Sequence, residues 1–264
     1  MMQSENASNL LERIEDSPNV EELRIWGLSG AGFVIRYGDE FVYIDPWLVP
    51  PFPPRTTHRT FPIPFPPEKV RKAKAVISTH EHADHCDVAT ITGIVSSTGA
   101  VFIGPKSAMD KAVNGGVAAA KAVTVSPGMQ FRISPSFDLR VFGSSDPYEP
   151  LAVMILLETP RGNILHSGDT AYFPGFKEIG DNYKIDVALL NYGKQIPNPE
   201  KPYYMNAQKL SMAARDLRAK IVVPMHWNLW EETREDPSSI EPILKSLSPS
   251  SEFKVVDGAE LLKI

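Results

Sequence analysis

The sequence predicts an α/β protein in which two β-sheets pack face to face and helices lie on the outside. Two observations lead to this prediction. The first half is rich in short apolar runs of strand length, and strands and helices then alternate in both halves. The halves are also alike in outline, because in each of them strands end in side chains that can bind metal ions. A composition of 42% hydrophobic and 22% charged residues is enough for a substantial core.

In the first half, runs rich in β-branched and aromatic residues predict strands, and a turn at 38–40 joins two of them in a hairpin. The expected strands are 23–28, 33–37, 41–47, 73–78 and 101–104. Residues 88–95 have the length and period of a helix. Pro105 marks the start of another helix, because proline is tolerated in the first turn.

In the second half, the pattern predicts strands at 123–125, 130–133, 138–142, 152–157, 163–166, 186–190 and 221–225. Helices are expected at 174–180, from Asn206 to Arg218, and around 242–245. Asn206 is the expected cap of its helix. The apolar stripe of that helix consists of Leu210, Ala213, Ala214 and Leu217.

The N-terminal segment, the apolar runs and the net charge limit the class of protein that is expected. Residues 1–22 read as a polar lead-in with about one helical turn at 10–14, and a single domain is expected at 23–264. The N-terminus lacks the features of a signal peptide, and no apolar run approaches the ~20 residues of a membrane span, so we expect a cytoplasmic protein without membrane contact. A net charge of −5 with scattered basic residues argues against nucleic acid as a partner.

Half of the six histidines lie in one segment, Thr79-His80-Glu81-His82-Ala83-Asp84-His85. Imidazole and carboxylate are the usual ligands of zinc and related divalent ions. The segment follows a predicted strand and precedes a predicted helix, which is the carboxyl end of a strand, where α/β proteins bind ligands. We expect His80 and His82 to hold one ion, and Asp84 and His85 a second. A polar turn with exposed histidines is the plainer alternative, but chance rarely produces this spacing.

Two later strands also end in ligand-type residues, Asp169 and His226. Each alone would be an ordinary turn aspartate or a packed histidine. Together with the histidine segment, Asp169 is expected to bridge two ions about 3.5–4 Å apart, and His226 to complete the second ion. Three more residues are expected to support the ligands from behind, with Asp45 orienting a ligand histidine: Asp45, Asp87 and His166.

Residues 49–67 alternate prolines with large apolar side chains. Proline excludes a helix or a central strand here. A long irregular stretch of this kind is a stiff lid over the metal site, an oligomer contact or a surface loop packed for structural reasons. A homo-oligomer is therefore among the expected states. The single cysteine, Cys86, excludes an internal disulfide.

The chain resembles the metallo-β-lactamase superfamily. The motifs that carry the resemblance are His80-x-His82-x-Asp84-His85, Ser167-Gly168-Asp169-Thr170 and Pro224-Met225-His226-Trp227. The resemblance covers nearly all of the chain from about residue 23 and implies a four-layer αββα sandwich with a dinuclear metal site at the sheet edges. Within the superfamily the chain is most similar to the L-ascorbate-6-phosphate lactonase branch, in stretches such as 102–106, 159–169 and 219–224.

One position departs from the superfamily pattern. Most members have a further histidine after the strand at 138–142, as third ligand of the first ion, and this chain has none there. Asp146 is the candidate substitute, and a turn aspartate before Pro147 is the equal alternative. A carboxylate in place of imidazole favours manganese or magnesium over zinc, and it leaves open a site with only one tightly bound ion. The expected cofactors are two divalent ions, manganese or zinc.

The resemblance implies a metal-dependent hydrolase in which a metal-activated hydroxide attacks a small, anionic lactone or ester, with Asp84 orienting or deprotonating the water. Tyr192, His166 and metal-bound water are candidates to protonate the leaving group. The expected substrate contacts are Lys106, Tyr192, Lys194 and Asn228. A metal-dependent phosphodiesterase or nuclease is the alternative, and a non-catalytic metal-binding protein is the second alternative.

Overall fold

A computed structural model describes residues 10–50, 59–194, 203–231, 233–256 and 261–264. Its first sheet has the strand order β14-β1-β2-β3-β4-β5-β6. The strands are β1 (Leu23–Ser29), β2 (Gly32–Tyr37), β3 (Glu40–Ile44), β4 (Ala75–Ile77), β5 (Val101–Gly104), β6 (Ala122–Thr124) and β14 (Leu261–Lys263). The strands β1 to β3 are antiparallel, and β3 to β6 are parallel. The predicted strands are confirmed, whereas the edge strand β14 was not predicted.

The second sheet has the strand order β13-β12-β11-β10-β9-β8-β7. The strands are β7 (Gln130–Ser134), β8 (Phe137–Gly143), β9 (Val153–Thr159), β10 (Gly162–His166), β11 (Val187–Asn191), β12 (Ile221–Met225) and β13 (Glu252–Phe253). An antiparallel meander from β7 to β10 continues into parallel pairing from β10 to β13. Only the two-residue strand β13 was missed.

Two of the described helices begin at a residue whose side chain caps them. The helices are α2 (Val88–Thr98), α3 (Lys106–Asn114), α4 (Gly175–Asn182), α5 (Ala207–Leu217) and α6 (Ile240–Leu247), with short 3-10 helices η1 (Pro67–Lys69), η2 (Ala119–Lys121) and η3 (Pro237–Ser239). The side chains of Asp87 and Asn206 accept hydrogen bonds from the first turns of α2 and α5. Gly99 ends α2 in a left-handed conformation, φ 74°, which glycine adopts without strain.

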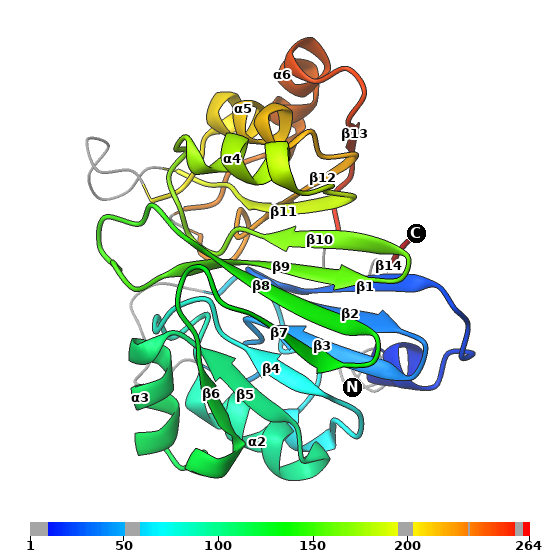
Figure 1. Cartoon of the computed structure of the whole chain (residues 1–264), viewed down its shortest axis with the longest axis vertical. Helices are drawn as coiled ribbons and strands as arrows, with labels where there is room; N and C mark the ends of the chain where they lie inside the picture. Colours follow the sequence, from blue (N-terminus) through cyan, green and yellow to red (C-terminus); the bar gives the residue numbers. More distant parts are fainter. Residues whose placement is uncertain (1–9, 51–58, 195–202, 232, 257–260) are drawn as a thin grey trace.

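The four layers follow from where the apolar side chains point. The two sheets face each other, with α2 and α3 outside one of them and α4, α5 and α6 on the outer side of the other (Figure 1). The core between the sheets includes Ile35, Ile44 and Leu157, all fully buried. Two further apolar clusters lie between each sheet and its helices. The αββα sandwich expected from the sequence is confirmed.

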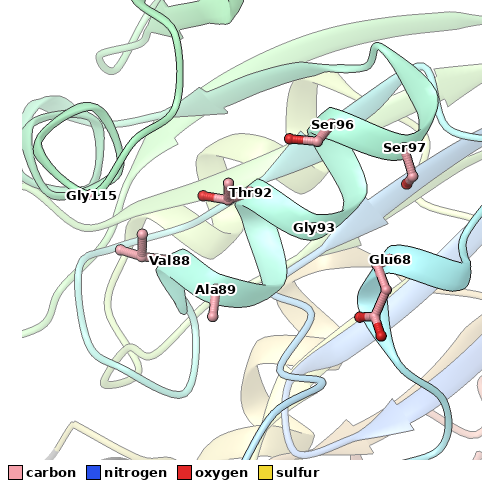
Figure 2. Close-up of a pocket in the computed structure, with 8 residues that line it drawn as sticks. All are labelled: Glu68, Val88, Ala89, Thr92, Gly93, Ser96, Ser97 and Gly115. Atoms are coloured by element: carbon pink, nitrogen blue, oxygen red, sulfur yellow. The ribbon is translucent and has the colours of Figure 1, made fainter.

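Two surface features complete the fold. Within the described residues, no helix is long and apolar enough to cross a membrane. A groove runs along α2, with Glu68 of η1 on one side and Gly115 on the other (Figure 2). Thr92 and Ser96 project from the helix into this groove. The groove contains no histidine or cysteine, so it is not a candidate metal site. Of the proline-rich stretch, residues 51–58 lie outside the described residues.

The N-terminal segment packs against the domain through a short helix at 10–15, as the expected helical turn suggested. The buried faces of Leu10 and Ile14 join the cluster beneath the first sheet. Glu15 is also buried, and its carboxylate accepts hydrogen bonds from the backbone N–H groups of Arg71 (2.8 Å) and Lys72 (3.0 Å) and from Nε of Arg71 (2.7 Å). This carboxylate ties the segment to the chain that enters β4.

Replacing Glu15 by alanine is expected to lower the free energy of unfolding by about 1–3 kcal/mol, because buried donors lose their acceptor. Urea unfolding followed by circular dichroism measures this loss. Asp16→Ala is the matched control, since the Asp16 carboxylate pairs with the same Arg71 at 2.8 Å but is 52% exposed. The control is expected to change little, because exposed ion pairs contribute little. Equal losses in the two variants would contradict this account of the segment.

Candidate metal centre

Six ligand-type side chains meet at the edge where the parallel strands of both sheets end. His80, His82, Asp84 and His85 come from the segment after β4. Asp169 follows β10, and His226 follows β12 directly. The six divide into two groups whose ligand atoms lie within 4.8 Å of one another: His80, His82 and Asp169, and Asp84, His85 and His226.

The second group converges on one point. Nε2 of His226 lies 3.2 Å from Nε2 of His85 and 3.1 Å from Oδ2 of Asp84. Oδ2 of Asp169 lies 3.5 Å from Nε2 of His85 and 3.9 Å from Nε2 of His226. Four ligand atoms around a tetrahedral ion, each about 2.0–2.2 Å from it, are separated by about 3.3–3.6 Å. These spacings therefore fit a small divalent ion.

The first group shares Asp169 with the second. Nε2 of His80 and Nδ1 of His82 are 3.0 Å apart, and Asp169 completes the group. Oδ1 of Asp169 is buried and has no hydrogen-bond partner among the described residues, while Oδ2 faces His85 and His226. The Asp169 carboxylate thus lies between the two groups, with Oδ2 toward the second group and Oδ1 without a hydrogen bond in the described part of the chain. This is the arrangement of a carboxylate that bridges two ions.

Asp45 fixes the orientation of two histidines through one carboxylate. It is fully buried, and its Oδ2 accepts hydrogen bonds from Nδ1 of His85 (2.7 Å) and from the hydroxyl of Thr79 (2.7 Å). The Thr79 hydroxyl has given its only proton to Asp45, so its oxygen accepts from Nδ1 of His80 at 3.1 Å. In their neutral forms both imidazoles are therefore protonated on Nδ1 and present a bare Nε2 to the centre. The expected role of Asp45 agrees with this geometry.

The electrostatics of the centre favour a cation. Burial and the neighbouring His85 lower the pKa of His80 to about 3, which keeps it in the neutral form that binds metals. Burial alone would raise the pKa of Asp84, but the hydrogen bond from His226 and the charge of His85 hold it well below its usual value. Burial acts the same way on Asp169, and the nearby histidines again lower its pKa. Although burial opposes the shift, the buried, ionised carboxylates also raise the pKa of His85 and of His226, so a positive charge among them is favourable. A bound cation would supply that charge and leave the imidazoles neutral.

The backbone is bent where the ligands leave the strands. Gly168, just before Asp169, has φ 55°, and a Cβ there would meet the Cβ of Thr79 at 2.9 Å. Asp45 and His226 also have positive φ, 45° and 68°, although neither is glycine. Such conformations cost of order 1–3 kcal/mol each and cluster at functional sites. The strain coincides with the ligands and with the residue that orients them.

A family model described as a beta-lactamase superfamily domain matches residues 41–227, which contain every residue of this centre. The chain belongs to the metallo-β-lactamase superfamily. It is a metal-dependent hydrolase of that superfamily. This donor set, with two imidazoles for each ion, the Asp169 carboxylate between them and Asp84 in the second group, fits the divalent ions that this class uses.

Two curated relatives share much of the sequence. A metal-dependent hydrolase from Pyrobaculum arsenaticum is 28% identical over 239 residues, which is 89% of this chain and 96% of the relative. A probable L-ascorbate-6-phosphate lactonase from Salmonella paratyphi B is 31% identical over 202 residues, which is 69% of this chain and 56% of the relative. The chain thus matches about half of the lactonase's length.

Solved structures confirm the fold of this superfamily member. A metallo hydrolase from the archaeon Ignicoccus hospitalis has a TM-score of 0.74 at 21% identity, over 92% of this chain and 98% of the other. An isothiocyanate hydrolase from Delia radicum gut bacteria also has a TM-score of 0.74, at 14% identity, over 90% of this chain and 98% of the other. At these identities the likeness concerns the fold alone.

Asp146, the expected substitute for the missing third histidine, lies beside the centre but outside both ligand groups. Its Oδ1 accepts hydrogen bonds from the backbone N–H of Tyr148 (2.8 Å) and Glu149 (3.2 Å). Its Oδ2 is buried and has no partner among the described residues. Burial raises the pKa of Asp146, and the charge of Asp169 adds to this effect. The turn role is present in the structure, and the free Oδ2 leaves a ligand role as a prediction.

If Oδ2 of Asp146 binds the first ion, Asp146→Ala is expected to lower the metal content from about two ions per chain to about one. Plasma mass spectrometry on protein purified without chelator measures this. Asp138→Ala is the control, because the Asp138 carboxylate is exposed and paired with Arg132. Two ions retained by the Asp146 variant would make Asp146 a turn residue only.

The other supporting residues are placed differently from one another. His166 is fully buried, donates from Nε2 to the carbonyl of Ala31 (2.8 Å) and accepts from the backbone N–H of Gly168 (3.1 Å). It thus holds the turn that presents Asp169, as a residue behind the ligands was expected to do. Asp87 departs from its expected role, because its carboxylate accepts from the backbone N–H of Thr90 (2.7 Å) and caps α2 instead of orienting a histidine.

The expected substrate contacts are mostly engaged elsewhere. The hydroxyl of Tyr192 bonds to Ser239 (2.8 Å) and to the carbonyl of Asp236 (3.2 Å), on the helix side of the second sheet. Lys106 pairs with Asp110 on the exposed face of α3. Lys194 is exposed, and its backbone N–H bonds to Thr233. Asn228 alone is buried close behind His226 in the chain, with its carbonyl accepting from Thr60.

Two tyrosines beside the centre were not predicted. The ring of Tyr204 is buried and lies 4.9 Å from the ring of His226. Tyr203 is half-buried, and burial together with the charges of Asp169 and Asp84 raises its pKa to about 12. Both phenols therefore stay protonated at neutral pH. The sequence held one signal, because the pair comes just before the capping Asn206 and so at the amino end of a helix that covers the sheet.

Proposed function

We propose that this metal-dependent hydrolase opens small lactones or related esters with two divalent ions, manganese or zinc, at the centre that Asp169 bridges. The observation that carries the proposal is the pair of ligand groups that share this one carboxylate. The likeness to the probable L-ascorbate-6-phosphate lactonase supports the choice of a lactone. The carboxylates among the ligands, with Asp146 beside them, support manganese.

When bound, the two ions supply a nucleophile at neutral pH, by lowering the pKa of water from 15.7 toward about 7, and they offset the negative charge that develops on the carbonyl oxygen. Asp84 is positioned to act on that water. Its Oδ2 lies 3.1 Å from Nε2 of His226, its carboxylate is ionised, and it is 9% exposed. It can therefore orient the water and accept its proton.

Protonation of the leaving oxygen needs a different side chain. Tyr192 and His166 donate their protons to partners away from the substrate edge. Tyr203 keeps its proton at neutral pH and is close enough to feel the charges of Asp169 and Asp84. Its ring lies 4.3 Å from the ring of Tyr204, which in turn lies 4.9 Å from the ring of His226. Tyr203 is our candidate donor for the leaving group, because a protonated phenol at the edge of the centre can act as a general acid.

The substrate test compares two ester classes on one preparation. The purified protein is assayed with a panel of five- and six-membered lactones and with an aryl phosphodiester, before and after treatment with a chelator. Lactone hydrolysis that the chelator abolishes and that manganese or zinc restores is the expected result. Chelator-sensitive cleavage of the phosphodiester, with no lactone opened, would reject the proposal in favour of a phosphodiesterase.

A further inference from the structure

Arg59 packs against an aromatic cluster at the carboxyl edge of the sheets. The guanidinium carbon of Arg59 is 4.5 Å from the ring centre of Trp47, and Trp47 packs against Trp230 at 5.2 Å. Leu229 and Trp230 complete this buried cluster. Stacking on an indole is a favourable position for a guanidinium. It fixes the plane of the group and therefore the direction of its N–H bonds.

The residues on both sides of this cluster are close in sequence to residues of the metal centre. Trp47 is two residues after Asp45, so their Cα atoms are within about 7 Å. Leu229 and Trp230 follow His226 in the same turn of chain. The backbone N–H of Thr60 donates to the carbonyl of Leu229 at 3.1 Å, which places Arg59 beside this turn. The aromatic cluster and the metal ligands therefore lie at the same edge of the sheets.

Two N–H donors in this cluster have no acceptor among the residues that the structure describes. They are Nε of Arg59 and Nε1 of Trp47, and both atoms are buried. Arg59 has one weak bond, from Nη1 to the carbonyl of Val49 at 3.5 Å, and within the described part of the chain no carboxylate lies within 4.0 Å of it. Asp87 is near enough to influence Arg59, but its carboxylate already caps α2. Buried donors without acceptors cost free energy that an incoming oxygen would recover.

We propose that Arg59 and Trp47 form an oxyanion-binding subsite that holds a phosphate or carboxylate group of the substrate. The planar guanidinium offers donors in the fork that matches such groups, and the indole N–H adds a third direction. The assignment of this oxyanion to the substrate rests on the proposed function. The subsite takes the place of the predicted contacts Lys106 and Lys194, which are exposed.

The charge of Arg59 is suited to this role. Burial lowers the pKa of Arg59 to about 10, and Asp87 partly opposes the shift. The guanidinium therefore remains positive at neutral pH. A desolvated cation next to unpaired donors binds an anion more strongly than an exposed lysine does, because water competes less for its hydrogen bonds.

Nuclear magnetic resonance tests the subsite without turnover. The chain has four tryptophans, so ¹H–¹⁵N spectra contain four indole signals, and Trp47→Phe identifies that of Trp47. Inorganic phosphate and acetate are titrated separately into the protein as isolated. We expect one of them to move the Trp47 signal to saturation, and the tighter of the two tells whether the subsite takes phosphate or carboxylate.

Variants link the signal to Arg59. Arg59→Gln is expected to raise the Kd of the anion by about 10- to 100-fold, as loss of hydrogen bonds from a charged donor predicts. Arg59→Lys keeps the charge but loses the fork, and a Kd between those of the wild type and Arg59→Gln is expected. Lys177→Gln is the control for net charge, because Lys177 pairs with Asp181 on α4. Unmoved signals of the indoles outside the aromatic cluster verify that the variants fold.

Two results would overturn the subsite: a Trp47 signal that neither anion moves, or the same Kd in the wild type and in Arg59→Gln. The second result would place the anion on the metal ions alone. Failure of the proposed function is distinguishable, because it would leave lactones intact while phosphate or acetate still titrated the Trp47 signal. If both proposals hold, Arg59→Gln also raises KM for a phosphorylated or carboxylated lactone by at least 10-fold.

Discussion

Asp84→Asn is expected to lower kcat for lactone hydrolysis by about 10²- to 10⁴-fold, the range that a positioned general base contributes. The amide has nearly the shape of the carboxylate, but it can neither accept the proton of the attacking water nor carry the charge that the pKa of Asp84 indicates. Its nitrogen would also oppose Nε2 of His226, which now donates to or shares an ion with Oδ2 at 3.1 Å. Steady-state kinetics on one lactone measures the loss.

Glu81→Gln is the matched control for this experiment. Glu81 lies in the same histidine segment and loses the same charge, but its side chain is exposed and is not part of either ligand group. It should keep kcat within about 2- to 3-fold, because surface substitutions have small effects. If Asp84→Asn were as active as Glu81→Gln, Asp84 would not act on the water and the mechanism above would be wrong.

Asp45→Asn is expected to weaken metal binding by about 10- to 100-fold, although Asp45 is not a ligand. The Asp45 carboxylate now accepts hydrogen bonds from three donors, the Thr79 hydroxyl, the Thr79 N–H and Nδ1 of His85. Asparagine has only one acceptor oxygen and can keep only part of these bonds. The imidazoles of His80 and His85 would then lose the partner that fixes their tautomer. Asparagine tolerates the positive φ of this position, so backbone strain does not explain the result.

Competition with a metal-binding dye measures this change in metal affinity. Asp87→Asn is the control, because Asp87 is a neighbouring aspartate that caps α2, and asparagine caps a helix as well as aspartate does. The control should keep the affinity of the wild type. An unchanged affinity in Asp45→Asn would mean that the His80 and His85 rings are held by packing rather than by the Asp45 carboxylate.

The sequence was sufficient for the centre because its ligands follow strands. A strand end followed by a turn is visible as an apolar run that stops at a polar residue, and the carboxyl ends of parallel strands meet at one edge. His80, Asp169 and His226 each stand at such a position, so their meeting could be predicted without knowledge of distances. Asp45 ends β3 in the same way, which is why its supporting role could also be inferred.

Side chains whose role depends on tertiary contacts could not be placed from sequence. Lys106 was selected for its charge. The rotation of α3 about its axis decides whether Lys106 faces the site or pairs with Asp110, one helical turn further on. Tyr192 follows the buried strand β11, and the sequence does not show on which face of the sheet its hydroxyl lies. In the structure the hydroxyl contacts Ser239 on the helix side. Arg59 was hidden in a proline-rich stretch without periodicity, and only its contact with Trp47 reveals it. The strands β13 and β14 are too short to carry an alternating pattern.

The most direct test of the two-ion hydrolase is a metal titration. Protein stripped with a chelator is titrated with manganese or with zinc, and bound metal and lactone hydrolysis are followed in the same samples. We expect no activity without metal, a maximum at about two ions per chain, and a loss of the second ion and of activity in Asp169→Asn, because the Asp169 carboxylate faces both ligand groups. Hydrolysis by the stripped protein, or full activity of Asp169→Asn with one ion or none, would contradict the two-ion mechanism.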